Sequence, residues 1–202
     1  MHSDLSRRSF LRGSALTTAG ATMVNATSAL LARAETAENS ASGAGSDAVP
    51  ITLQANGAAR VLRVEPRATL AEVLRGPLGL TGTKIGCNRG ACSACTVLLD
   101  AQPICSCMML AIDVGARAIT TIEGLAQGDT LHPVQQAFIE HDALQCGYCT
   151  PGMVLSCAAL LDRMPAPDAD DVRAAISGHV CRCGTYPHVV KATLAAAKAC
   201  RG

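Results

Sequence analysis

The fold is decided by a ten-residue stretch rich in glycine, alanine and cysteine: Gly86-Cys87-Asn88-Arg89-Gly90-Ala91-Cys92-Ser93-Ala94-Cys95. Its three thiols have C-x4-C-x2-C spacing, the plant-type ligand run for a 2Fe-2S cluster. Small residues between the thiols let backbone N–H groups approach the sulfur atoms. Such a cluster needs four thiolates, so the stretch predicts a further ligand elsewhere. The candidates are Cys105 and Cys107, just beyond the apolar run 96–99.

Composition limits the kind of core that the chain can build. The 202 residues include 11 cysteines but only two Phe, two Tyr and no Trp. Ala, Val, Leu and Ile must therefore supply the core, and two small domains suit this length better than one large domain. Small domains with few aromatic residues often rely on a metal for stability. A formal net charge of +1, with no run of Lys or Arg, argues against nucleic acid as a partner.

The N-terminus carries a targeting pattern. Residues 6–12 read Ser-Arg-Arg-Ser-Phe-Leu-Arg, an uncharged run follows from Gly13 to Ala32, and residues 32–34 read Ala-Arg-Ala. These features predict a twin-arginine signal peptide over residues 1–34, removed after Ala34, and a periplasmic location. The alternative is a membrane anchor, but the run is too rich in Ala, Thr, Gly and Asn for a convincing span. We expect no membrane span in the mature chain.

Export by this route changes how the thiols are interpreted. The twin-arginine pathway carries folded proteins, so a cofactor can be inserted in the cytosol before the chain meets an oxidising compartment. Eleven cysteines is also an odd number, which a complete set of intramolecular disulfides cannot use. Metal binding is therefore favoured over disulfides.

The first half of the mature chain reads as a mixed α and β domain. Residues 35–48 are small and polar and are expected to form a flexible linker. An alternating pattern then predicts a β-hairpin, with strands at Ile51–Gln54 and Val61–Val64 joined by Asn56-Gly57.

The hairpin is followed by a short helix and more strands. Thr69 and Glu72 form a capping box for a helix to about Arg75, which Gly76-Pro77 ends. After the cysteine stretch, strands are expected at Thr96–Leu99, around Ile104 and over Ala118–Ile122. This order predicts a ferredoxin-like β-grasp domain over residues 49–125.

From residue 131 onward, apolar residues recur at helical spacing. Four helices are expected: His132–Ile139 with Pro133 near its start, Thr150–Leu161 with Thr150 as N-cap, Asp168–Ile176 and Pro187–Ala199. Residues 126–202 are thus predicted to form an all-α four-helix-bundle domain, which makes the fold class α+β.

Two further pairs of thiols precede predicted helices. Cys146 and Cys149 lie before the second helix, and Cys181 and Cys183 lie before the fourth. A helix N-terminus favours thiolate over thiol and presents N–H groups to sulfur. Antiparallel helices can bring the two pairs together, so the pattern predicts a second metal centre.

Zinc is the main alternative at both cysteine groups, because paired Cys motifs are often structural zinc sites. The first group is not two matched pairs, however, and a C-x-C pair is tight for one tetrahedral zinc, so we favour iron and sulfur. Cys157 and Cys200 are interpreted as ordinary thiols. The histidines form no metal motif, and the sequence has no recognisable hydrolase triad or phosphate loop, so no catalytic residue is predicted.

Five ordered motifs together resemble a known family. They are Thr81-Gly82-Thr83-Lys84-Ile85-Gly86-Cys87, Cys92-Ser93-Ala94-Cys95-Thr96-Val97, Thr120-Thr121-Ile122-Glu123-Gly124-Leu125, Gln145-Cys146-Gly147-Tyr148-Cys149-Thr150-Pro151-Gly152-Met153 and Cys181-Arg182-Cys183-Gly184-Thr185-Tyr186. This set resembles the iron-sulfur subunit of the xanthine dehydrogenase and aldehyde oxidase family of molybdenum hydroxylases. It looks most like the small subunits of periplasmic aldehyde oxidoreductases and isoquinoline-type oxidoreductases.

The resemblance implies two 2Fe-2S clusters and their ligands. The β-grasp cluster would use Cys87, Cys92, Cys95 and Cys107, and the bundle cluster would use Cys146, Cys149, Cys181 and Cys183. It also implies a larger partner subunit that holds molybdopterin, with Gln145 contacting the pterin and Cys183 as the nearest ligand. Ser93 departs from the glycine of many relatives, which puts hydrogen bonding near the first cluster in doubt.

The leading hypothesis is therefore an electron-transfer subunit of a periplasmic molybdenum hydroxylase that oxidises an aldehyde or an N-heterocycle. Electrons would pass from the pterin through the bundle cluster and the β-grasp cluster to FAD on another subunit or to an external acceptor such as a cytochrome. Two alternatives from other classes are a freestanding two-cluster ferredoxin-like carrier and a zinc-stabilised interaction module.

Overall fold

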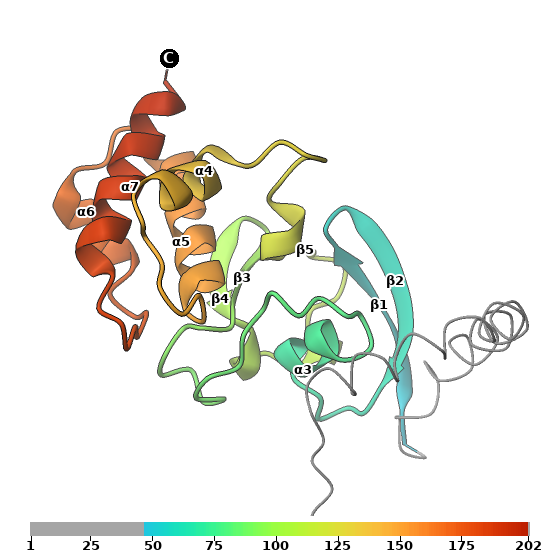
Figure 1. Ribbon diagram of the computed structural model, residues 1–202. Helices are drawn as coiled ribbons and strands as arrows, with labels where there is room; N and C mark the ends of the chain where they lie inside the picture. Colours follow the sequence, from blue (N-terminus) through green and yellow to red (C-terminus); the bar gives the residue numbers. More distant parts are fainter. Residues whose placement is uncertain (1–46, 202) are drawn as a thin grey trace, which may run out of the picture. The chain divides into compact units, whose positions relative to one another are not determined.

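The computed structural model describes residues 47–201, in which a five-stranded sheet is followed by a group of four helices (Figure 1). The predicted signal peptide and all but the last two residues of the predicted linker lie outside the described residues.

The sheet begins with the predicted hairpin. β1 (Val49–Ala55) pairs antiparallel with β2 (Ala58–Val64) in an unbroken register from Val49 opposite Val64 to Ala55 opposite Ala58. Asn56 and Gly57 both have positive φ, at 51° and 75°, as a two-residue type I′ turn requires. The hairpin prediction is confirmed, with strands longer than expected.

A short helix and three more strands complete this half. α3 (Leu70–Arg75) carries the full capping box between Thr69 and Glu72, as predicted. β3 (Thr96–Leu99), β4 (Gln102–Cys105) and β5 (Ala118–Thr120) follow, and the sheet order is β2-β1-β5-β3-β4 with β1 and β5 parallel. Its core contains Leu53, Leu70, Leu74, Val97 and Ile119.

Short 3-10 turns occupy Ser106–Met108, Ala111–Asp113 and Ile122–Gly124. The expected strand Ala118–Ile122 was therefore too long. Pairing stops at Thr120 because the Thr121 side chain and N–H turn to Asn56 and the chain tightens into the last 3-10 turn.

The four helices are α4 (Pro133–Glu140), α5 (Thr150–Arg163), α6 (Ala169–Ala175) and α7 (Tyr186–Ala199). All four expected helices are present. The prediction that Thr150 caps α5 was wrong: Cys149 is the N-cap and Thr150 is the first helical residue. Asp168 caps α6, accepting from the N–H groups of Asp170 and Asp171.

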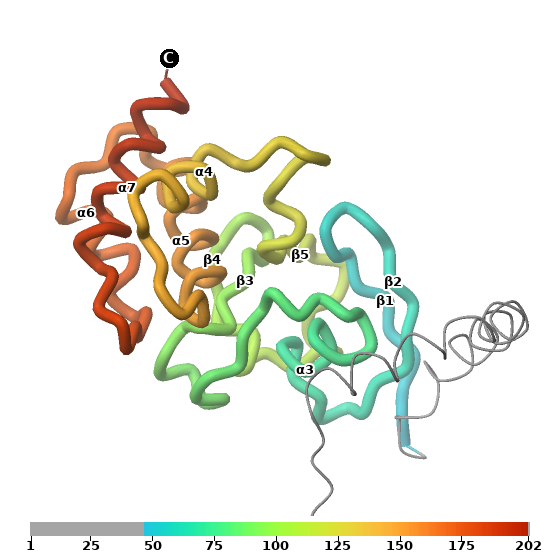
Figure 2. Tube along the Cα trace, viewed as in Figure 1, coloured from blue at the N-terminus to red at the C-terminus, as the bar shows by residue number. Residues whose placement is uncertain are grey.

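Helix α5 joins the two halves. On one face of α5, Val154 and Cys157 pack in the helical core with Phe138 of α4 and Val189 of α7. Another face packs on the sheet, where Leu155 and Ala159 contact Leu98 of β3. In Figure 2, α5 correspondingly runs beside β3 and β4. Between residues 47 and 201, no helix is long and apolar enough to cross a bilayer.

Candidate metal centres

The first cysteine loop bends so that its backbone N–H groups point at sulfur. Positive φ angles at Asn88 (50°) and Gly90 (73°) turn the chain around the Cys87 side chain. The N–H groups of Arg89 and Ala91 then donate to Cys87 Sγ at 3.4 and 3.2 Å. This is the environment that stabilises a ligand thiolate.

The remaining thiols of the first group are drawn into the same loop. Cys87 N–H donates to Cys92 Sγ at 3.4 Å, and Gly90 N–H donates to Cys107 Sγ at 3.3 Å. Cys107 is also in side-chain contact with Cys95, and both are buried in one small cluster. Cys105, by contrast, lies 3.7 Å from the Ser93 hydroxyl. These contacts favour Cys107 over Cys105 as the fourth ligand.

The thiols differ in how readily they ionise. The pKa of Cys87 is lowered to about 7, first by the N–H of Arg89 and then by the Cys92 side chain. The pKa of Cys95 is raised to about 12, first by burial; the backbone N–H of Cys107 opposes this rise, and the Cys107 side chain adds to it. A buried thiol of this kind becomes a thiolate only when a nearby metal charge compensates for its burial.

The second group forms at the starts of two helices. Cys149 is the N-cap of α5 and contacts Cys181 through its side chain. Cys181 Sγ lies 3.5 Å from the hydroxyl of Thr185, the N-cap of α7. Cys146 is exposed and Cys183 is half-buried. The structure thus places all four predicted ligands on the two segments that lead into α5 and α7.

The pKa values of the thiols also differ within the second group. Burial, together with the hydrogen bond with Cys181, raises the pKa of Cys149 to about 12. For Cys181, burial acts to raise the pKa, but hydrogen bonds from the Thr185 hydroxyl and N–H outweigh it and lower the pKa to about 7. The contact between Cys149 and Cys181 therefore joins a thiol with a raised pKa to one with a lowered pKa.

The contacts pair six of the thiols: Cys87 with Cys92, Cys95 with Cys107, and Cys149 with Cys181. Four thiolates around two irons give each iron two thiolates, so these pairs and their N–H donors suit 2Fe-2S clusters. All eleven cysteines lie in the described part of the chain and are free. Across that same part, no three His, Cys, Asp or Glu side chains gather around a point as ligands of one metal ion would.

The two cysteine groups touch each other. The N–H of Val180, next to Cys181, donates to the carbonyl of Cys92 at 3.1 Å. The Tyr148 hydroxyl, between Cys146 and Cys149, donates to the carbonyl of Ile85 at 2.6 Å. Sequence reasoning did not identify these contacts, which join segments far apart in the chain.

Gln145 is exposed directly before the exposed Cys146. Its predicted contact with a pterin, and that of Cys183, involve a group on another chain and stay predictions. His179, by contrast, is buried, and its Nε2 lies 2.8 Å from the Ser156 hydroxyl. Burial lowers the pKa of His179 to about 4, so the ring is neutral and serves the packing of the helical half.

Comparison with protein families matches three parts of the chain. Residues 53–117 match a 2Fe-2S iron-sulfur cluster binding domain, and residues 121–194 match a second [2Fe-2S] binding domain. Residues 4–24 match a twin-arginine translocation signal sequence.

Individual relatives agree with these matches. The aldehyde oxidoreductase iron-sulfur-binding subunit PaoA of Escherichia coli O157:H7 is 40% identical, over 94% of this chain and 86% of its own length. The nicotine 6-hydroxylase small subunit of Paenarthrobacter nicotinovorans is 45% identical, over 74% and 90%. A chain of quinoline 2-oxidoreductase from Pseudomonas putida 86 superposes with a TM-score of 0.74 at 46% identity, covering 77% of this chain and 98% of that one.

Proposed function

The chain belongs to the iron-sulfur subunits of the molybdenum hydroxylase family that includes xanthine dehydrogenase and aldehyde oxidase, and we propose that it relays electrons through two clusters in a fixed order. The bundle cluster receives electrons from a molybdopterin on a larger partner subunit. The β-grasp cluster passes them to FAD on another subunit or to an external acceptor. A twin-arginine signal directs the protein to the periplasm.

The proposed ligands are the eight cysteines that the family resemblance implies, and contacts join Cys87 to Cys92, Cys95 to Cys107 and Cys149 to Cys181. Cys87, Cys92, Cys95 and Cys107 hold the β-grasp cluster, and Cys146, Cys149, Cys181 and Cys183 hold the bundle cluster. A bound 2Fe-2S cluster supplies one-electron redox chemistry. The substrate, an aldehyde or an N-heterocycle, gains a hydroxyl group from water on the partner subunit, which releases two electrons and two protons. The two electrons then leave singly.

The residues of this chain bind and shield the clusters. Backbone N–H groups of Arg89, Gly90 and Ala91 donate to ligand sulfurs and stabilise negative charge there. Burial of Cys95 and Cys107 excludes water from one side of the first cluster. Since hydrogen bonds to sulfur and solvent exposure set the potential of such clusters, these residues tune the β-grasp cluster, the second station of the relay.

The observation that carries the relay is the hydrogen bond from Val180 N–H to the Cys92 carbonyl. Cys92 is a proposed ligand of one cluster, and Val180 precedes Cys181, a proposed ligand of the other. The two cluster-binding backbones are therefore in direct contact, which supports electron passage within this one chain.

Exposure supports the orientation of the relay. Cys146 and Gln145 are exposed, whereas Cys95 and Cys107 are buried in a cluster with Ala71 of α3. We infer that the exposed side of the bundle group faces the partner's pterin, with Gln145 and Cys183 nearest to it. The β-grasp cluster is then the outer station.

Purification of the tagged chain from its native host tests this function. We expect a larger chain to copurify with it, together with molybdenum and a pterin. Iron recovered with no larger chain and no molybdenum would favour the freestanding two-cluster carrier instead.

A further inference from the structure

Tyr148 lies at the junction of the two cysteine groups. It follows Gly147, whose φ of 79° turns the chain between Cys146 and Cys149. The side chain is 48% exposed, yet its hydroxyl donates to the Ile85 carbonyl at 2.6 Å. Ile85 is two residues before Cys87, so this bond runs from within one ligand segment to the edge of the other.

The ring of Tyr148 makes a second contact with the first loop. A Cβ atom added at Gly86 would lie 3.8 Å from Tyr148 Cε1 and 3.1 Å from Cys92 Sγ. The ring thus lies against the Gly86 backbone on the side that also faces a ligand sulfur. Glycine at this position allows the tyrosine, the ligand and the backbone to approach closely.

The other contacts between the two groups arise from the backbone or from close packing. Val180 N–H donates to the Cys92 carbonyl, and Gly152 leaves room for the Ser93 carbonyl. Only a proline at position 180 would remove the first of these, and it would also restrict the backbone there. The Tyr148 hydroxyl, in contrast, is a side-chain hydrogen bond that can be removed while the aromatic ring stays.

We propose that Tyr148 is a positioning residue for electron transfer between the two clusters. Its hydroxyl fixes the loop 85–95 against the segment 146–149, and thereby sets the separation of the two ligand sets. In the transfer one electron passes from the bundle cluster, which is oxidised, to the β-grasp cluster, which is reduced. The proposal rests on the two-cluster relay described above. Its physical reason is that electron tunnelling falls steeply with distance, so a small shift of one loop changes the rate.

The test uses Tyr148→Phe in the cluster-loaded complex with its partner subunit. We expect intercluster electron transfer, followed after flash reduction, to slow about two- to tenfold, because small misplacements of reacting groups are costly. The magnetic interaction between the two reduced clusters in electron paramagnetic resonance should change as well. Iron content should stay at about four per chain.

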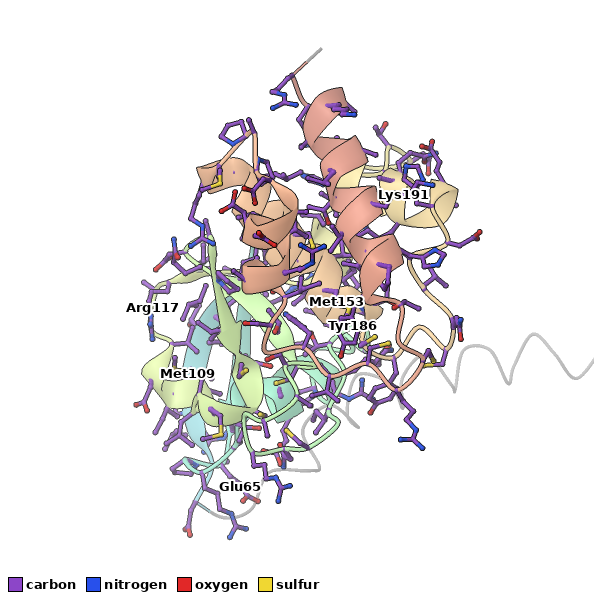
Figure 3. The ribbon with its side chains drawn as sticks, turned by 90° about the vertical axis from the view of Figure 1, so that its left-hand side faces the viewer. Glu65, Met109, Arg117, Met153, Tyr186 and Lys191 are labelled. Atoms are coloured by element: carbon purple, nitrogen blue, oxygen red, sulfur yellow. The ribbon has the colours of Figure 1, made fainter. Side chains whose placement is uncertain are left out.

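Tyr186→Phe is the matched control. The Tyr186 hydroxyl accepts from Cys181 N–H and donates to the His179 carbonyl, so its bonds stay within one segment of the helical half. Figure 3 labels Tyr186 beside Met153, at the base of the helices. We expect this variant to shift the potential of the bundle cluster and to leave the magnetic interaction between the clusters unchanged.

Three results would overturn the positioning role. They are an unchanged rate and magnetic interaction in Tyr148→Phe, an equal change in Tyr186→Phe, or loss of iron from Tyr148→Phe, which would make the hydroxyl an assembly requirement. Failure of the proposed function would be distinguishable, since the unmodified chain would then lack two clusters or be recovered with no larger partner chain and no molybdenum.

Discussion

The first cysteine group is held by a loop and a neighbouring 3-10 turn that fold around the sulfurs, whereas the second is assembled from the starts of α5 and α7. In the first, backbone N–H groups donate to Cys87, Cys92 and Cys107. In the second, the hydroxyl and the N–H of Thr185, at the start of α7, donate to Cys181, and Cys146 is exposed. The difference teaches that one site is largely complete within its own loop, while the other depends on helix packing and on what covers it.

The largest expected effect concerns the fourth ligand of the first group. Cys107→Ser should remove one cluster, about half of the iron, because it replaces a proposed ligand whose sulfur accepts from the Gly90 N–H. Iron analysis and absorbance measure this loss.

Cys105→Ser is the control and should keep all of the iron, since the Cys105 sulfur lies beside Ser93. The opposite pair of results would make Cys105 the ligand.

Cys149→Ser should remove the other half of the iron, and the paramagnetic signal that remains should differ from the one that remains in Cys107→Ser.

The next largest effect is a difference in the rate at which a chelator removes iron from the two cysteine groups. In the chain freed from its partner, a chelator should remove iron from the bundle group several-fold faster, because Cys146 is exposed and the buried Cys95 and Cys107 are not reached. The decay of the paramagnetic signal of each cluster measures the loss of iron from its cysteine group. Faster loss from the β-grasp group would reverse the comparison.

Several features were predictable because their signals are local. The turn at Asn56-Gly57, the capping box at Thr69 and the strand Thr96–Leu99 each depend on neighbouring residues, and all are present. The ligand spacing of residues 87–95 is local in the same way. The family comparisons confirm two 2Fe-2S domains, and the assignment of individual ligands stays a proposal.

Other features depend on tertiary structure. Thr150 looked like a helix cap, yet it is the first residue of α5, and the N-cap is Cys149, whose side chain contacts Cys181. Spacing alone left Cys105 and Cys107 both open as the fourth ligand, and only the family resemblance selected Cys107. In the structure, β4 ends at Cys105 and Cys107 belongs to a 3-10 turn. The contacts of Tyr148 and Val180 with the first loop form only when α5 packs on the sheet.

The next effect is a loss of stability on substitution of Gly152, which lies where the helical half contacts the first cysteine loop. A Cβ at Gly152 would lie 2.6 Å from the Ser93 carbonyl oxygen. Although alanine favours a helix, Gly152→Ala should destabilise the protein by about 1–3 kcal/mol because the backbone of the first loop must move. Denaturant unfolding measures the change.

Gly178→Ala is the matched comparison. Its Cβ would lie 3.2 Å from the Ser93 hydroxyl, which can rotate away, so its cost should be smaller. Equal losses of stability in Gly152→Ala and Gly178→Ala would contradict this difference, because the backbone of the first loop would then move as readily as the Ser93 side chain.

Two buried serines give the smallest effect. Ser156→Ala removes the partner of His179 Nε2, and His179 Nδ1 already lacks one among the described residues, so about 1–3 kcal/mol should be lost. Ser106→Ala should cost about 1 kcal/mol or less, because the Cys95 carbonyl keeps the Ser106 N–H as a donor. Thermal unfolding compares them, and a larger cost for Ser106→Ala would contradict this difference.

The count of iron and acid-labile sulfide per chain, made on the protein purified from its native host, tests the central claim most directly. Two clusters in one chain predict about four irons and four sulfides, with two distinct paramagnetic signals on reduction. Zinc with no labile sulfide and no visible absorbance would contradict the account.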